Sequence, residues 1–129
     1  MKIHHIGYLV KDIEKASEEF IRLGFLKQGD AVEDTDRGVL IVFLENGGYK
    51  IELVQVVDEI SPMYRLYKKH GNSPYHICYE TSNLPLEIER MTGGADFVLL
   101  QPPSPAPAIS GREVAFLVSK NIGLVELLG

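Results

Sequence analysis

Cysteine, positive charge and long apolar runs are scarce in this chain, and each scarcity excludes a class of protein or of binding partner. Cys78 is the only cysteine, which excludes an intrachain disulfide and a cluster of thiolate metal ligands. Positive charge is also scarce, since 13 Lys and Arg residues stand against 18 Asp and Glu residues and the net charge is -5. A general affinity for nucleic acid phosphates is therefore not expected. No apolar run approaches the ~20 residues that a membrane-spanning helix needs.

The remaining composition is typical of a soluble globular protein. Of the 129 residues, 45% are hydrophobic and 24% are charged, which argues against disorder. A chain of about this length buries roughly two thirds of the surface that it exposes when unfolded. The first residues lead into a strand pattern and not into a signal peptide. We therefore expect one cytoplasmic domain over residues 1–129, with neither a membrane nor a nucleic acid as a partner.

An internal repeat is the most informative feature of the sequence. The matching stretches are residues 3–10 with 74–80, and residues 49–54 with 123–128. Each copy delivers one histidine and one glutamate. His5 and Glu52 lie 47 residues apart, and His76 and Glu126 lie 50 residues apart. Self-similarity at such a spacing indicates a duplicated unit.

Hydrophobic periodicity predicts the element order βαβββ for each copy. In the first copy Asp12 can cap a helix, and Gly24 suits the end of that helix. The predicted fold class is therefore α+β, with two βαβββ modules in tandem. The modules cover approximately residues 1–57 and 74–129, and residues 58–73 form a connector.

Two further segments lie between these elements, and one is predicted to form a short helix and the other a loop. Ser61 and Pro62 are typical of the cap and the first position of a short connector helix, which would end at Gly71. The proline-rich run at residues 102–107 predicts an irregular loop.

Strand alternation predicts which side chains share a face. Residues two apart in a strand point the same way, so the apolar residues of one parity form the face that the helices cover. These residues are Ile6, Tyr8, Val10, Ile51, Leu53, Ile77, Tyr79, Val125 and Leu127. His5, Glu52, His76 and Glu126 have the opposite parity. If the two copies face each other, these four side chains converge as a ligand set for a divalent transition metal. The expected architecture is a curved sheet around a metal-binding cavity.

At these residues the chain resembles the vicinal oxygen chelate superfamily, which includes glyoxalases, methylmalonyl-CoA epimerases, extradiol dioxygenases and bleomycin-resistance proteins. The resemblance covers nearly the whole length and is most specific at residues 5–7, 51–53, 75–80, 114–117 and 122–127. It implies the vicinal oxygen chelate fold. It also maps the four metal ligands of the superfamily's isomerases, one from each strand, onto His5, Glu52, His76 and Glu126.

The resemblance further implies the chemistry of the site. One divalent ion per chain, with Ni, Co or Zn favoured and Mn or Fe compatible, would polarise a carbonyl as a Lewis acid. By resemblance to the glyoxalases, Glu126 would take a proton from the carbon next to that carbonyl, and Glu52 would return it.

Two enzymes of the superfamily share this chemistry. Glyoxalase I, a lactoylglutathione lyase, converts a hemithioacetal to a lactoyl thioester, whereas methylmalonyl-CoA epimerase inverts the carbon next to a thioester. The short chain, Glu52 and Arg37 favour glyoxalase I, with the epimerase as the alternative. The intact ligand set argues against a ligand-sequestering protein of the bleomycin-resistance kind. We expect a homodimer; the metal, the thiol co-substrate and the completion of the site within or across chains stay open.

Arg37 is the predicted substrate-binding residue. It begins the strand that leads to the cavity, at a position where the epimerases commonly carry Gln or His. Its planar, charged guanidinium group suits a carboxylate or a phosphate. The connector cations Arg65, Lys68 and Lys69 are ordinary for a solvated helix face, with the phosphates of a coenzyme A ester as the alternative. Cys78 is predicted to be a small buried hydrophobic residue.

Overall fold

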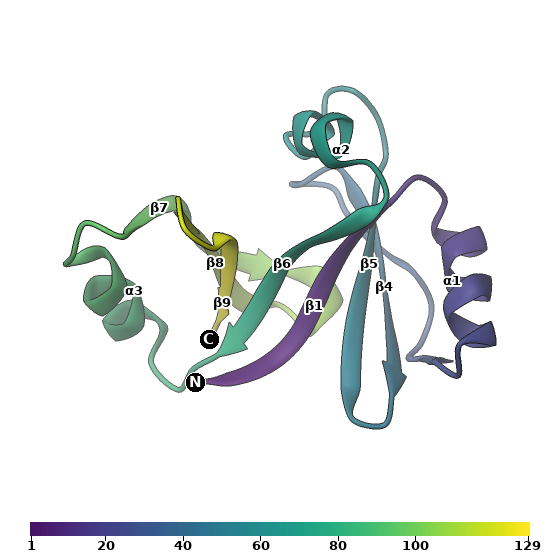
Figure 1. Ribbon diagram of the computed structural model, residues 1–129, viewed down its shortest axis with the longest axis horizontal. Coiled ribbons are helices and arrows are strands. Elements are labelled where there is room, and N and C mark those ends of the chain that lie inside the picture. Colours follow the sequence, from purple (N-terminus) through teal and green to yellow (C-terminus); the bar gives the residue numbers. More distant parts are fainter. The chain divides into compact units, whose positions relative to one another are not determined.

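The computed structural model in Figure 1 describes residues 1–129. The chain divides into two compact units, one made of His5–Tyr75 and the other of Met1–His4 with His76–Gly129. The connector thus belongs to the first unit, and the first four residues belong to the second. None of the helices is long and apolar enough to cross a membrane.

The first unit contains a mixed sheet and one covering helix. Its elements are β1 (Lys2–Val10), α1 (Ile13–Arg22), β2 (Leu26–Lys27), β3 (Val32–Asp34), β4 (Val39–Asn46), β5 (Tyr49–Val56) and α2 (Tyr64–His70). The strand order is β2-β4-β5-β1, and β3 pairs with β4. β1 runs parallel to β5, whereas β4 and β5 form an antiparallel hairpin. Figure 1 shows α1 beside this hairpin.

Helix α1 begins and ends where the sequence predicts. The Asp12 carboxylate accepts a hydrogen bond of 3.0 Å from the backbone N–H of Lys15, which satisfies one of the open donors of the first turn. The chain leaves the helix at Gly24, whose φ of +99° favours glycine. α1 contacts β4 and β5, and apolar side chains fill the space between them. The buried members of this core are Val10, Ile13, Val42, Leu44 and Leu53.

The second unit repeats the plan of the first. Its elements are β6 (Ser73–Glu80), α3 (Leu84–Thr92), β7 (Phe97–Ala106), the short 3-10 helix η1 (Pro107–Ile109), β8 (Arg112–Ser119) and β9 (Gly123–Leu128). The strand order is β6-β9-β8-β7, and β6 runs parallel to β9. The buried core next to α3 consists of Leu84, Ala115, Leu117, Val125 and Leu127. The α+β class and the two βαβββ modules are confirmed, with the short strands β2 and β3 of the first unit in the place of the single strand β7 of the second.

The predicted alternation of faces holds in both cores. Val10 and Leu53 lie in the core next to α1, and Val125 and Leu127 lie in the core next to α3. Ile77 departs from the prediction, because 37% of its surface stays exposed.

The proline-rich run is not an irregular loop, and this prediction is wrong. Residues 102–106 belong to β7, which pairs with β8. β7 is the last strand in the order, and an edge strand tolerates proline because its outer backbone groups need no partner. The pairing shifts register between Leu99 and Gln101 and again between Gln101 and Ser104, as at a β-bulge.

The connector helix begins two residues later than predicted. α2 starts at Tyr64 without a side-chain cap, and it ends before Gly71 as expected. The Ser61 hydroxyl instead donates a hydrogen bond of 2.7 Å to the Arg37 carbonyl. Gly38 follows with a φ of +61°, and a Cβ at this position would lie 2.9 Å from the Cβ of Ser61. The connector therefore packs tightly on the start of β4, where only glycine fits.

Candidate metal centre

His5 and Glu52 form a buried pair in the first unit. His5 lies on β1 and Glu52 on β5, and the parallel register places Gly7 opposite Glu52. Since residues two apart in a strand share a face, the two side chains leave the sheet on the same side. The Nε2 atom of His5 lies 3.4 Å from Oε2 of Glu52, and the two side chains are 0% and 6% exposed.

His76 and Glu126 form the equivalent pair in the second unit. His76 lies on β6 and Glu126 on β9, and the parallel register places Cys78 opposite Glu126. The Nε2 atom of His76 lies 3.1 Å from Oε2 of Glu126, and the side chains are 0% and 5% exposed. In both units the glutamate faces the residue two positions after the histidine. The duplication therefore preserves the pairing register as well as the residue types.

The chemistry of this donor set fits a divalent metal. Removing an ionised carboxylate from water costs several kcal/mol unless a nearby positive charge compensates it, and a neutral imidazole carries no such charge. Imidazole nitrogens and carboxylate oxygens are ordinary ligands of divalent transition metals.

A phenylalanine ring contacts each of these histidines edge to face. The ring centroids of Phe43 and His5 are 5.2 Å apart with an interplanar angle of 81°, and those of Phe116 and His76 are 5.5 Å apart at 86°. The sequence reasoning missed both rings. A signal exists, because Phe43 and Phe116 precede the glutamate of their own copy by nine and ten positions.

Arg37 contacts an acidic residue of its own unit. Its Nη1 donates to Oδ2 of Asp34 at 2.6 Å, and its backbone N–H donates to Oδ1 of the same carboxylate at 3.0 Å. The side chains of Arg37 and Asp34 are 13% and 2% exposed. A substrate anion that binds Arg37 must therefore compete with a carboxylate that is already in place.

Cys78, the nearby strand residue Glu80 and the connector cations have the surroundings of structural or surface residues. Cys78 is buried in an apolar cluster with Val114 and Leu128. Glu80 accepts a hydrogen bond of 2.6 Å from Nη2 of Arg112. This bond lowers the pKa of the Glu80 carboxyl against a smaller opposing effect of burial. The cations that the sequence singled out on the connector are all exposed at the surface: Arg65, Lys68 and Lys69.

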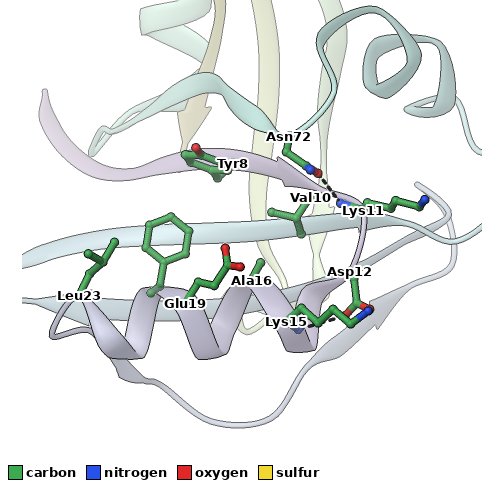
Figure 2. Close-up of a pocket in the computed structure, with 10 residues that line it drawn as sticks. Tyr8, Val10, Lys11, Asp12, Lys15, Ala16, Glu19, Leu23 and Asn72 are labelled. Atoms are coloured by element: carbon green, nitrogen blue, oxygen red, sulfur yellow. Dashed lines mark hydrogen bonds and ion pairs between the residues drawn. The ribbon is translucent and has the colours of Figure 1, made fainter.

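A pocket of about 630 Å³ lies on the other side of β1 from His5. Figure 2 shows Tyr8 and Val10 of β1 and Leu23 at the end of α1 among its lining residues, and the backbone N–H of Lys11 donates to Asn72 at its rim. Tyr8 and Val10 have the parity of the helix-covered face, and His5 has the opposite parity. This pocket is therefore separate from the His5 and Glu52 pair. Its volume alone does not make it part of the candidate metal centre.

Comparison with known proteins agrees with the resemblance found in the sequence. A family model of the glyoxalase/bleomycin resistance protein/dioxygenase superfamily matches residues 4–116. The chain is 28% identical to the ethylmalonyl-CoA/methylmalonyl-CoA epimerase of Cereibacter sphaeroides, over 98% of this chain and 96% of that protein. It is 30% identical to the mitochondrial methylmalonyl-CoA epimerase of Homo sapiens, over 98% of this chain and 72% of that protein.

The solved structures show the same fold. A hypothetical protein from Bacillus halodurans superposes with a TM-score of 0.88 at 28% identity, over 98% of this chain and 92% of that chain. The family match covers most of the chain, and the structural likeness covers nearly all of it. The protein belongs to the glyoxalase/bleomycin resistance protein/dioxygenase superfamily, which is the vicinal oxygen chelate superfamily.

Proposed function

We propose that this protein is a metal-dependent epimerase that inverts the carbon next to the thioester of methylmalonyl-CoA. The observation that carries the proposal is the pair of equivalent buried His and Glu contacts at 3.4 and 3.1 Å. The named relatives that align over nearly the whole chain are methylmalonyl-CoA epimerases. The sequence alone favoured glyoxalase I and kept the epimerase as the alternative. The relatives support the alternative and lend no support to glyoxalase I.

The proposed metal ligands are His5, Glu52, His76 and Glu126, with one divalent ion per chain. Two neutral imidazoles and two carboxylates would leave the assembly uncharged around a divalent ion, and an octahedral ion would keep two positions for substrate or water. The ion would polarise the thioester carbonyl and so make the adjacent C–H bond more acidic. Ni, Co and Zn suit these ligands best, and Mn and Fe are compatible with them.

Inversion at carbon needs an acceptor and a donor of protons on opposite faces of the substrate. In the proposed mechanism the Glu126 carboxylate takes the proton from the carbon next to the thioester, and the C–H electron pair moves onto the carbonyl oxygen. For this step the Glu52 carboxyl must have left the metal and taken up a proton from solvent before the substrate reacts, and it then gives that proton to the opposite face. After one inversion Glu126 is protonated and Glu52 is ionised, so the pair is ready for the opposite epimer.

Substrate anchoring by Arg37 stays a prediction. The cations of α2 suit the phosphates of the coenzyme A moiety, because phosphate binding requires positive charge that is accessible to solvent. Arg37 instead suits the single carboxylate of the methylmalonyl group, in competition with Asp34.

A paired assay tests the function. Purified protein is analysed for bound metal, and it is then assayed with methylmalonyl-CoA and, separately, with methylglyoxal and a thiol. We expect turnover of methylmalonyl-CoA alone. Turnover of the hemithioacetal alone would restore glyoxalase I, and the absence of both activities from metal-loaded protein would contradict an isomerase.

Isotope labelling in deuterium oxide tests the two-base mechanism. A proton that Glu52 returns comes from a carboxyl group that exchanges with solvent. At early times the epimerised product should therefore carry deuterium, whereas the remaining substrate should not. A product that keeps the original proton would show that a single base removes and returns it.

A further inference from the structure

The aromatic rings beside the two histidines are part of the duplicated plan. Phe43 is the direct cross-strand partner of Glu52 in the β4–β5 hairpin, and Phe116 is the direct partner of Glu126 in the β8–β9 pair. Opposite residues of an antiparallel pair share a face, so each ring projects on the side of its glutamate. From there it contacts the histidine of its own unit. Both rings are half-buried.

These contacts restrict the orientation of the imidazoles. The terminal torsion of a histidine side chain has a broad energy profile, so rotation about it can turn Nε2 away from a ligand at little cost. An edge-to-face ring is a preferred aromatic geometry, so rotation of the imidazole plane away from that geometry would lose the contact. In both units the Nε2 atom faces a glutamate oxygen.

We propose that Phe43 and Phe116 are positioning residues. They hold the imidazoles of His5 and His76 in the orientation that binds metal, each ring through its contact with the histidine of its own unit. The effect on metal affinity rests on the proposed function. The effect on imidazole mobility does not, because it concerns contacts that exist within each unit.

Leucine replacements separate positioning from packing. Phe43→Leu and Phe116→Leu keep an apolar side chain but remove the flat ring edge. Phe20→Leu is the matched control, because the Phe20 ring makes an edge-to-face contact with Tyr8 at 5.4 Å and 81° in the core next to α1. It loses the same ring and touches neither histidine pair.

The first measurement is imidazole mobility in metal-free protein, from relaxation dispersion of the histidine ring resonances in NMR spectra. We expect Phe43→Leu to increase the exchange contribution for the His5 ring, and Phe116→Leu to increase it for the His76 ring. Phe20→Leu should change neither. An exchange contribution that stays at the wild-type value in both ring variants would overturn the proposal.

The second measurement is metal affinity, from competition with a chelator on the Co²⁺-loaded protein. Loss of an outer hydrogen bond that orients a metal-bound histidine typically weakens binding by about 10- to 100-fold, and an aromatic contact belongs at the lower end of this range. We expect about a tenfold loss in each ring variant, with an altered visible spectrum of Co²⁺, and none in Phe20→Leu. Equal losses in all three variants would show a general packing effect and overturn the proposal. A wild-type protein without stoichiometric metal would refute the proposed metal centre, and imidazole mobility would still decide the role of the rings.

Discussion

Replacing Arg37 by alanine should destabilise the protein far more than loss of a surface cation would. The substitution leaves the Asp34 carboxylate, whose side chain is 2% exposed, without the guanidinium that now lies 2.6 Å away. Removal of one partner from a buried ion pair costs about 3–5 kcal/mol. Because Arg37 itself keeps 13% exposure, we expect the lower end of that range, about 3 kcal/mol. The free energy of unfolding from urea denaturation measures this loss.

A double-mutant cycle separates the charge pair from the other contacts of Arg37. Asp34→Asn in the Arg37→Ala background removes the buried charge and should restore most of the lost stability. Arg90→Ala is the surface control. It breaks a 2.7 Å pair with Glu87 in which the arginine is 63% exposed, and such pairs contribute less than about 1 kcal/mol. A loss in Arg37→Ala no larger than that in Arg90→Ala would refute the buried-pair reasoning.

The same double variant also tests substrate anchoring. If Arg37 binds the substrate carboxylate, combining Arg37→Ala with Asp34→Asn should raise the Michaelis constant more than it slows turnover. An unchanged Michaelis constant would leave Arg37 with the structural role alone.

Three further predictions concern the candidate centre and one surface pair. His5→Ala or His76→Ala should abolish stoichiometric metal, measured by elemental analysis, and full occupancy in both would refute the ligand assignment. Glu126→Gln should keep the metal but slow turnover by on the order of a hundredfold or more; near-normal activity with full metal would direct the same test to Glu52. Arg112 lowers the pKa of the Glu80 carboxyl below its ordinary value of 4.5. The ionised Glu80 therefore stabilises the fold above pH 4.5, and this stabilisation is lost as the pH falls through the lowered pKa. Glu80→Gln should therefore be less stable than wild type at neutral pH, and the difference in urea denaturation should be small for so exposed a pair and vanish in acid.

The duplicated pairs were predictable because strand alternation is a strong local constraint. A shift of one residue in any of the four strands would move its histidine or glutamate to the helix-covered face. The apolar residues on either side of Glu52 and Glu126 exclude that register, since Ile51, Leu53, Val125 and Leu127 pack next to the helices. The sequence therefore predicted which face each pair occupies without knowledge of the turns.

The surroundings of Arg37 were not predictable from alternation. Asp34 lies three positions earlier, at the end of β3, and only the turn between β3 and β4 brings its carboxylate onto the guanidinium. The contact between Ser61 and the Arg37 carbonyl spans 24 positions and has no periodic signal. The strand in the proline-rich run was missed for a similar reason, because tolerance of proline depends on the strand order and not on the local residues.

The function was harder to choose than the fold because both candidate reactions use the same carboxylates. A proton transfer between two carbons and an inversion at one carbon both begin with a base next to a polarised carbonyl. They differ in where the proton returns, which the ligand set does not encode. Within each unit the glutamate has nearly the same burial and the same histidine contact, so neither glutamate is distinguished as the permanent base. Two equivalent carboxylates therefore do not choose between the two reactions, and the preference for inversion rests on the epimerases among the relatives.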